Sequence, residues 1–137
     1  MAKKLKIYTD GGARGNPGPA GVGVAIFDEK ENLIKTAKKY LGKATNNQAE
    51  YKALILALEL AKKLGAEEVD CFLDSQLIVN QLNRKYKIKD HQLGSLFIKV
   101  WNLSLGFKKI KFHYLPRNKN KIADKLVNQA INAHFKS

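Results

Sequence analysis

The sequence predicts an α/β fold in which a five-stranded mixed sheet is flanked by about four helices. Short segments with alternating apolar side chains indicate strands, and longer segments with apolar residues three and four apart indicate helices. Their order is the third observation, because three strands follow one another directly, whereas helices precede each of the last two. The first three can form an antiparallel meander, and the last two can pair in parallel through helical crossovers. We expect residues 1–137 to form a single domain.

The first strands surround a stretch that is rich in glycine and proline. Residues 4–10 alternate apolar and polar side chains and predict a strand, which runs into the stretch YTDGGARGNPGPAG at 8–21. Glycine and proline are costly inside regular structure, so we predict a shaped loop there. Residues 20–41 then predict a hairpin. Its glycines, Gly21 and Gly23, suit a strand that other backbone crosses closely.

Helices and strands alternate in the rest of the chain. A long helix is predicted over 48–64, with Asn46 or Asn47 as its N-cap and Gly65 at its end. The later elements are a strand over 68–74, a helix over 75–85, a helix over 91–105, a strand over 108–115 and a helix over 121–135. We expect Trp101, which lies in an apolar helical stripe, to be part of the core.

The charge of the chain is strongly positive and unevenly spread. The formal net charge is +13, and residues 75–137 contain 13 lysine or arginine residues against 2 acids. Residues 1–74 contain 12 basic residues against 10 acids. Solubility or a generally lysine-rich composition would also give a positive charge, but the concentration in one half favours a polyanion as the partner.

Several classes of protein are excluded by the composition. No run of 18 apolar residues occurs, so no membrane span is expected. The N-terminal segment lacks the apolar region of a signal peptide. The one cysteine, Cys71, lies in an apolar run and is expected in the core, because a single thiol cannot form a disulfide within the chain. We therefore expect a cytoplasmic protein.

Four acidic residues occupy positions that suit a site better than a surface. Asp10 and Asp74 end two predicted strands, and ligands of open α/β sheets bind beyond the carboxyl ends of strands. Glu50 lies on the apolar stripe of the long helix, where a carboxylate is unusual; a role as a helix-dipole partner is the alternative. Asp124 lies early in the last helix among several lysines, where it could equally form a local ion pair.

Convergence of these acids would require cations between them, because like charges repel. An all-oxygen set suits Mg²⁺ or Mn²⁺, whereas zinc would need histidines or cysteines, which are sparse and scattered here. Two such cations about 4 Å apart can activate a water and stabilise the leaving oxygen in phosphodiester hydrolysis. The sequence thus predicts an acidic metal site within a basic surface, formed by Asp10, Glu50, Asp74 and Asp124.

Four sequence blocks resemble those of ribonuclease H, type 1, in the ribonuclease H-like superfamily. The block YTDGGARGNPGPAG resembles the family's first catalytic aspartate, here Asp10, and its glycine-rich loop. TNNQAEY places the family's glutamate at Glu50, LDSQL gives Asp74, and LPRNKNKIADKLVNQA gives Asp124. Each block alone is only moderately specific. All four occur in order, with fitting elements between them, over nearly the whole chain.

The resemblance implies cleavage of the RNA strand of RNA–DNA hybrids with two Mg²⁺ ions, for which Mn²⁺ could substitute, leaving 3′-hydroxyl and 5′-phosphate ends. Gly11 and Gly12 would bring backbone close to the minor groove, where the 2′-hydroxyl groups lie. Thr45 would help to seat a DNA phosphate. The resemblance implies further hybrid contacts for Asn16, Asn46, Asn47 and Gln76. The asparagines could serve as caps and turn residues at the same time.

Two departures from the family pattern concern the last loop and the segment before the helix at 91–105. Many members have a histidine in the loop before the last aspartate, whereas PRNKNKI has none. Arg117 could substitute in part by handling phosphate or ions, since arginine does not transfer protons at neutral pH. Some members insert a basic helix where this chain has only NRKYKIKDH, and Tyr86 there could stack on a sugar or pack. The basic residues of that segment are Arg84, Lys85, Lys87 and Lys89.

Other interpretations stay open at this point. A related nuclease could act on double-stranded RNA or on DNA, since the fold hosts several nucleases. A non-catalytic nucleic-acid-binding domain would predict a broken set of acids, yet all of them are present. A domain of a reverse transcriptase is a further alternative. We expect a monomer with an RNA–DNA hybrid as its partner and no membrane association.

Overall fold

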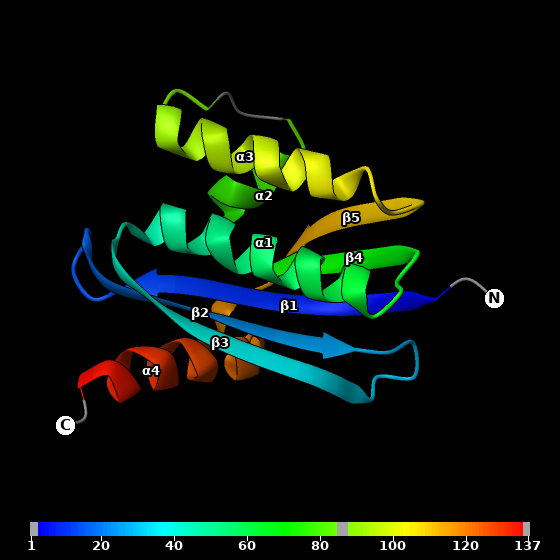
Figure 1. Cartoon of the computed structure of the whole chain (residues 1–137), viewed down its shortest axis with the longest axis horizontal. Helices are drawn as coiled ribbons and strands as arrows, with labels where there is room; N and C mark the ends of the chain where they lie inside the picture. Colours follow the sequence, from blue (N-terminus) through cyan, green and yellow to red (C-terminus); the bar gives the residue numbers. More distant parts are fainter. Residues whose placement is uncertain (1–2, 85–87, 136–137) are drawn as a thin grey trace.

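One five-stranded sheet forms the centre of the molecule, with helices on both of its faces (Figure 1). The structure is a computed structural model that describes residues 3–84 and 88–135. The strands are β1 (Lys4–Ala13), β2 (Gly18–Phe27), β3 (Leu33–Ala44), β4 (Glu68–Leu73) and β5 (Lys109–Tyr114). Their order is β3-β2-β1-β4-β5; β2 is antiparallel to both β1 and β3, and β4 is parallel to both β1 and β5. The predicted mixed sheet is confirmed.

The described part of the chain contains four α-helices. They are α1 (Asn46–Lys63), α2 (Gln76–Leu82), α3 (His91–Ser104) and α4 (Lys121–Phe135), and a short 3-10 helix, η1 (Arg117–Lys119), precedes α4. Helix α1 packs against β1 and β2, and α3 packs on α1. Helix α4 packs against β2 and β3 from the opposite face (Figure 1). No helix among the described residues is both long enough and apolar enough to span a bilayer.

The main core lies between the sheet and α1. The side chains of Leu5 and Ile7 in β1 are fully buried, as are those of Leu54 and Leu58 in α1. Burying a side chain of this kind completely stabilises a fold by about 1.5–3 kcal/mol. Cys71 of β4 is fully buried in the same core, as its apolar surroundings in the sequence predict.

Two glycines of β2 let α4 lie directly on the sheet. A Cβ atom at Gly23 would lie 2.2 Å from the carbonyl oxygen of Ala123, and one at Gly21 would lie 3.1 Å from the carbonyl oxygen of Val127. The prediction that other backbone crosses β2 at these glycines is confirmed. Because Gly23 pairs with Asp10 in the β1–β2 ladder, this contact fixes the first turns of α4 over the end of the sheet that carries Asp10.

The stretch rich in glycine and proline is mostly strand, which corrects the prediction of a shaped loop between the strand predicted to end at 10 and the hairpin predicted to begin at 20. Strand β1 continues to Ala13 and β2 begins at Gly18, so the connection is confined to 14–17. The hairpin ladder continues through the glycines, with Gly12 opposite Gly21. Cross-strand hydrogen bonds in this ladder offset the entropy that glycine loses in a strand.

Thr45, rather than Asn46 or Asn47, is the N-cap of α1. Its hydroxyl oxygen accepts a hydrogen bond from the backbone N–H of Gln48 at 3.1 Å. The side-chain oxygen of Gln48 accepts one from the N–H of Thr45 at 3.0 Å. This reciprocal capping box satisfies two N–H groups at once. Because this pair places the N-cap of α1 at Thr45, neither Asn46 nor Asn47 is the cap.

Two predictions near α2 and α3 are also wrong. Helix α2 ends at Leu82 rather than at 85, and Arg84 takes a φ of 62°, in the left-handed region that helices avoid. Trp101 is 41% exposed rather than part of the core, and the Arg84 guanidinium lies 4.0 Å from the centroid of its ring. The buried face of α3 is supplied by Leu93 and Val100 instead. The basic and aromatic residues Lys85, Tyr86 and Lys87 lie outside the described residues.

Candidate active site

Two adjacent parallel strands bring two acids to one edge of the sheet. The β1–β4 ladder pairs Thr9 with Leu73, so that Asp10 and Asp74 follow at the same level. Asp74 is the first residue after β4, whereas Asp10 lies inside β1, which continues past it along β2. The placement of both acids at one edge therefore agrees with the sequence prediction, although β1 does not end at Asp10.

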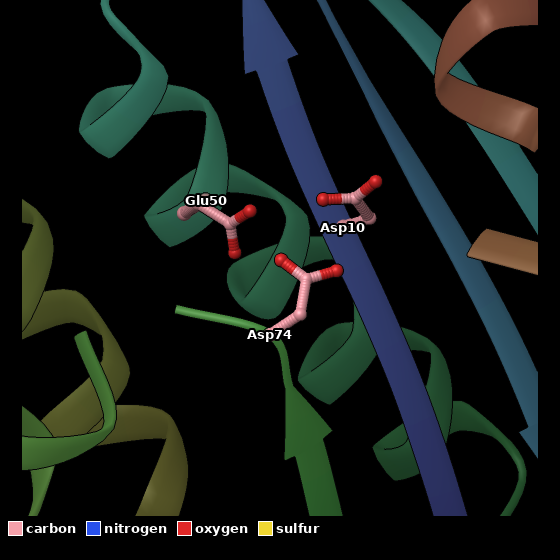
Figure 2. A group of neighbouring side chains, drawn as sticks. All are labelled: Asp10, Glu50 and Asp74. Carbon is pink, nitrogen blue, oxygen red and sulfur yellow. The ribbon is translucent and has the colours of Figure 1, made fainter. Parts of the chain in front are cut away.

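Glu50 reaches the same place from the start of α1. A Cβ atom at Gly11 would lie 2.2 Å from the backbone carbonyl carbon and oxygen of Ala49, so β1 and α1 are in direct backbone contact beside Asp10. One carboxylate oxygen from each of Asp10, Glu50 and Asp74 lies within 4.8 Å of the other two. Figure 2 shows the three side chains converging from β1, from α1 and from the end of β4.

Glu50 lies at the base of the site without a full set of partners. It is 5% exposed, and its Oε1 accepts a hydrogen bond from the N–H of Gly11 at 3.2 Å. Its Oε2 is buried and has no hydrogen-bond partner among the described residues. Burial raises the pKa of Glu50 well above its ordinary value, and the charge of Asp10 adds to the rise. A buried carboxylate oxygen without a donor is costly, so positive charge is expected here.

Asp10 is also a buried acid with a raised pKa. It is 4% exposed, and burial raises its pKa to about 7. The charges of Asp74 and Asp124 add to this rise. Two neighbouring acids whose pKa values are both raised share protons near neutral pH unless a cation compensates their charge.

Asp124 lines the same pocket from the first turn of α4. Its carboxylate accepts a hydrogen bond from the Arg117 guanidinium at 3.3 Å. It does not belong to the group of three acids that the described residues bring closest together, yet it is near enough to raise the pKa of Asp10. Both interpretations from the sequence, a pocket acid and a local ion pair, therefore apply to Asp124.

A pocket of about 420 Å³ contains all four predicted acids. The other predicted residues on its wall are Gly11, Gly12, Asn46, Asn47 and Arg117. Three predicted residues do not form part of this wall. Asn16 is exposed, and its Oδ1 accepts a hydrogen bond from the N–H of Asn46 at 3.0 Å. Thr45 caps α1, and Gln76 is the exposed first residue of α2.

Arg14 and Asn120 are among the residues at the site that were not predicted from the sequence. Arg14 lies on the pocket wall, where its guanidinium donates a hydrogen bond to Oδ1 of Asn128 at 3.3 Å. Asn120 is 2% exposed and donates a hydrogen bond to Oδ2 of Asp74 at 2.8 Å. In the sequence, Arg14 is inconspicuous among glycines, and nothing in the spacing of PRNKNK separates Asn120 from Asn118.

The donor set fits a hard divalent cation. The group of three acids offers only carboxylate oxygens, which suit Mg²⁺ or Mn²⁺, and includes none of the histidine or cysteine ligands that zinc prefers. The buried Oε2 of Glu50 and the raised pKa values of Glu50 and Asp10 indicate negative charge that a cation would compensate. Asp10, Glu50 and Asp74 could hold such an ion, with Asp124 as a further ligand across the pocket.

The fold is that of the ribonuclease H-like class of proteins, and the comparisons agree. Residues 8–130 match the reverse transcriptase-like family. The structure is similar to that of LC11-RNase H1 in complex with an RNA/DNA hybrid, with a TM-score of 0.92 and 45% identity over 96% of this chain and 99% of that chain. RNase H1 from the archaeon Halobacterium salinarum gives a TM-score of 0.93 and 37% identity over 95% of this chain and 98% of that chain. The chain belongs to the ribonuclease H type 1 family.

Two of the curated relatives are longer than this chain. It is 40% identical over 135 residues to the bifunctional protein Rv2228c of Mycobacterium tuberculosis, covering 98% of this chain but 37% of that protein. It is 38% identical over 128 residues to ribonuclease HI of Halobacterium salinarum, covering 93% of this chain and 64% of that protein. The chain therefore spans less than two thirds of the length of either relative.

Proposed function

We propose that the chain is an endoribonuclease that hydrolyses the RNA strand of RNA–DNA hybrids with two Mg²⁺ ions, leaving 3′-hydroxyl and 5′-phosphate ends. The observation that carries this proposal is the convergence of Asp10, Glu50 and Asp74, whose oxygens lie within 4.8 Å of one another. Grouping like charges in a buried position costs stability, so a functional reason is expected. The net charge of +13 and the relationship to a protein described in complex with an RNA/DNA hybrid favour the hybrid as substrate.

The four acids, Asp10, Glu50, Asp74 and Asp124, would hold the cations. Bound cations of this kind activate a water and stabilise the leaving oxygen of a phosphodiester. The chain itself supplies the arrangement of the acids. The N–H of Gly11 holds Oε1 of Glu50 at 3.2 Å, and the backbone contact between Gly11 and Ala49 holds α1 against β1. Because backbone contacts fix these positions, the acids are already arranged to bind cations.

The wall formed by the β1–β2 connection and the start of α1 would bind the hybrid. Oδ1 of Asn46 accepts a hydrogen bond from the N–H of Ala13 at 2.8 Å, and Oδ1 of Asn16 accepts one from the N–H of Asn46 at 3.0 Å. With their oxygens engaged in this way, both side-chain NH₂ groups are oriented to serve as donors to nucleic acid. Gly12 would let a 2′-hydroxyl group approach the backbone. We propose further contacts with the hybrid for Gly11, Thr45, Asn47 and Gln76.

Two arginines at the pocket would supply positive charge for phosphate groups. Asn128 holds the Arg14 guanidinium at 3.3 Å, and Asp124 holds that of Arg117 at the same distance. Arginine stays protonated at neutral pH, so Arg117 would handle phosphate or ions and would not transfer protons as a loop histidine can. Each phosphate contact releases counterions, so affinity for the hybrid should fall with added salt.

A gel assay tests the proposal with end-labelled RNA annealed to DNA, incubated with Mg²⁺, with Mn²⁺ or with a chelator. Parallel lanes contain the same RNA alone, in an RNA duplex, and the matched DNA duplex. Metal-dependent cleavage of the hybrid alone, with 3′-hydroxyl and 5′-phosphate products, is the expected result. Cleavage of the RNA duplex would widen the substrate class. No cleavage by the folded protein would refute the proposal and favour a nucleic-acid-binding domain.

We also propose that residues 1–137 act as a single domain, as a monomer, in the cytoplasm. The main core of the described residues joins the sheet to α1, and the buried thiol of Cys71 is compatible with a reducing compartment. Size-exclusion chromatography with light scattering checks the monomer. Fluorescence microscopy of a tagged copy checks the location.

A further inference from the structure

We propose that Asn120 is a positioning residue that orients Asp74 for cation binding, an inference that rests on the proposed function. Asn120 lies between η1 and α4 and is 2% exposed. A polar side chain buried to this extent is rare unless it is hydrogen-bonded. Its role is therefore defined by the groups to which it is hydrogen-bonded.

The side-chain amide of Asn120 joins the two strands that lead to Asp10 and Asp74. Its Nδ2 donates hydrogen bonds to the carbonyl oxygen of Thr9 and to Oδ2 of Asp74, both at 2.8 Å. Thr9 directly precedes Asp10, and β1 and β4 are paired at this level. The two N–H groups of this amide therefore link β1 to the end of β4. The bond to Oδ2 restricts the rotation of the Asp74 carboxylate and leaves its other oxygen for a cation.

The backbone of Asn120 links the same point to α4. Its carbonyl oxygen accepts a hydrogen bond from the N–H of Asp124 at 3.1 Å, and its N–H donates one to the carbonyl oxygen of Arg117 at 3.0 Å. Asn120 therefore forms hydrogen bonds with Asp74, with Asp124 and with Thr9, which directly precedes Asp10. A single residue relates three of the four acids, which come from three different parts of the fold.

The hydrogen bonds of Asn120 distinguish positioning from a general contribution to stability. Its Oδ1 is buried and has no hydrogen-bond partner among the described residues. An unsatisfied buried oxygen is costly, so stability alone would favour a residue without it. The donor end of the amide explains its presence. Aspartate has the same shape but would direct an oxygen at two acceptors, the Thr9 carbonyl and the Asp74 carboxylate.

Removing the amide should weaken cation binding without removing a ligand. Outer partners that orient a metal ligand typically change metal affinity by roughly 10- to 100-fold. We expect Asn120→Ala to raise the Mn²⁺ concentration for half-saturation by roughly 10- to 100-fold. The KM for the hybrid should change little, and kcat should recover at high Mn²⁺ concentration, because Asp74 itself is still present.

Mn²⁺ binding can be measured apart from cleavage by the electron paramagnetic resonance signal of the free ion. Asn118→Ala, at an exposed position two residues earlier, is the matched control. Thermal unfolding in chelator shows whether each variant folds, and Asn120→Ser replaces Asn120→Ala if the alanine variant does not. Asp74→Asn, alone and combined with the Asn120 substitution, completes a double-mutant cycle.

Weaker Mn²⁺ binding, recovery of kcat at high Mn²⁺ and strong non-additivity with Asp74→Asn would support the inference. Unchanged Mn²⁺ affinity in a folded Asn120 variant would overturn it, and so would a loss that adds fully to that of Asp74→Asn. If the wild-type protein binds no Mn²⁺, the proposed function fails together with the inference. If the wild-type protein binds Mn²⁺ and cleaves the hybrid while the variant matches it, only the inference fails.

Discussion

Replacing Asp10 by asparagine should stabilise the protein when divalent cations are removed. Asp10 is 4% exposed, and burial raises its pKa from an ordinary value of 3.8 to about 7. An acid whose pKa is raised on folding binds protons more tightly in the folded state. Its contribution to stability is fully present below the unfolded pKa and is lost as the pH rises through the folded pKa. Asparagine has nearly the same shape and no charge, so it avoids this loss.

The size of the effect follows from the pKa of Asp10. A rise from 3.8 to about 7 corresponds to about 4 kcal/mol, at about 1.4 kcal/mol for each pKa unit. This figure is a ceiling, because a proton shared by two interacting acids such as Asp10 and Glu50 belongs to the pair rather than to Asp10 alone. We expect a gain of about 2–4 kcal/mol above about pH 7 and almost none below about pH 4. Each kcal/mol should raise Tm by roughly 3–5 °C in a domain of this size.

The assay is thermal unfolding in chelator, followed by circular dichroism, from about pH 4 to about pH 8. The Tm difference between Asp10→Asn and wild type should grow up to about pH 7 and then level off. Asp28→Asn is the control with the opposite sign, because a hydrogen bond from the Asn32 backbone N–H lowers the pKa of Asp28. A variant no more stable than wild type at about pH 8, or a difference independent of pH, would refute the reasoning. Added Mg²⁺ should stabilise wild type more than the variant.

Three further predictions concern catalysis and packing. Asp10→Asn should abolish metal-dependent cleavage while filter binding to the hybrid is retained, and residual cleavage would remove Asp10 from the mechanism. Gly11→Ala should cost about 1–3 kcal/mol in chemical denaturation and most of the activity, because its Cβ would lie 2.2 Å from the backbone of Ala49. Gly12→Ala is the stability control, since the nearest atom would lie 3.9 Å away. Arg14→Gln should raise KM with little change in kcat and reduce the salt dependence of log affinity by about one; an unchanged slope would contradict a phosphate contact.

The features that could be predicted from the sequence depend on local pattern. Alternating residues lead up to Asp10 and Asp74, and both acids do lie at one edge of the sheet. Glu50 interrupts an apolar helical stripe, and it is buried at 5% exposure. Gly21 and Gly23 indicate close backbone contact, which α4 makes. Each of these observations needs only the period of a strand or a helix and the sterics of one residue.

The features that could not be predicted depend on contacts between segments far apart in the chain. The pairing of Asn120 with Thr9 and Asp74 exists only once β1, β4 and the loop before α4 are together. Trp101 is exposed, not in the core as the sequence predicts, because α3 has apolar residues on more than its buried side. Periodicity alone therefore does not identify the face that contacts the core. The continuation of β1 through Gly12 cannot be predicted from the sequence, because glycine weakens an isolated strand. Pairing with β2 stabilises the strand there.

Strand β1 is the middle strand of the sheet, with two strands on either side and helices above and below. Backbone amides in such a position exchange with solvent only when the whole domain opens. A ligand bound at Asp10 therefore adds its binding free energy to the global unfolding equilibrium, not to a local fluctuation. Cation and substrate occupancy should slow deuterium uptake along β1 and lower the population of open molecules that proteases cleave. The loaded protein would then outlast the metal-free protein under proteolysis.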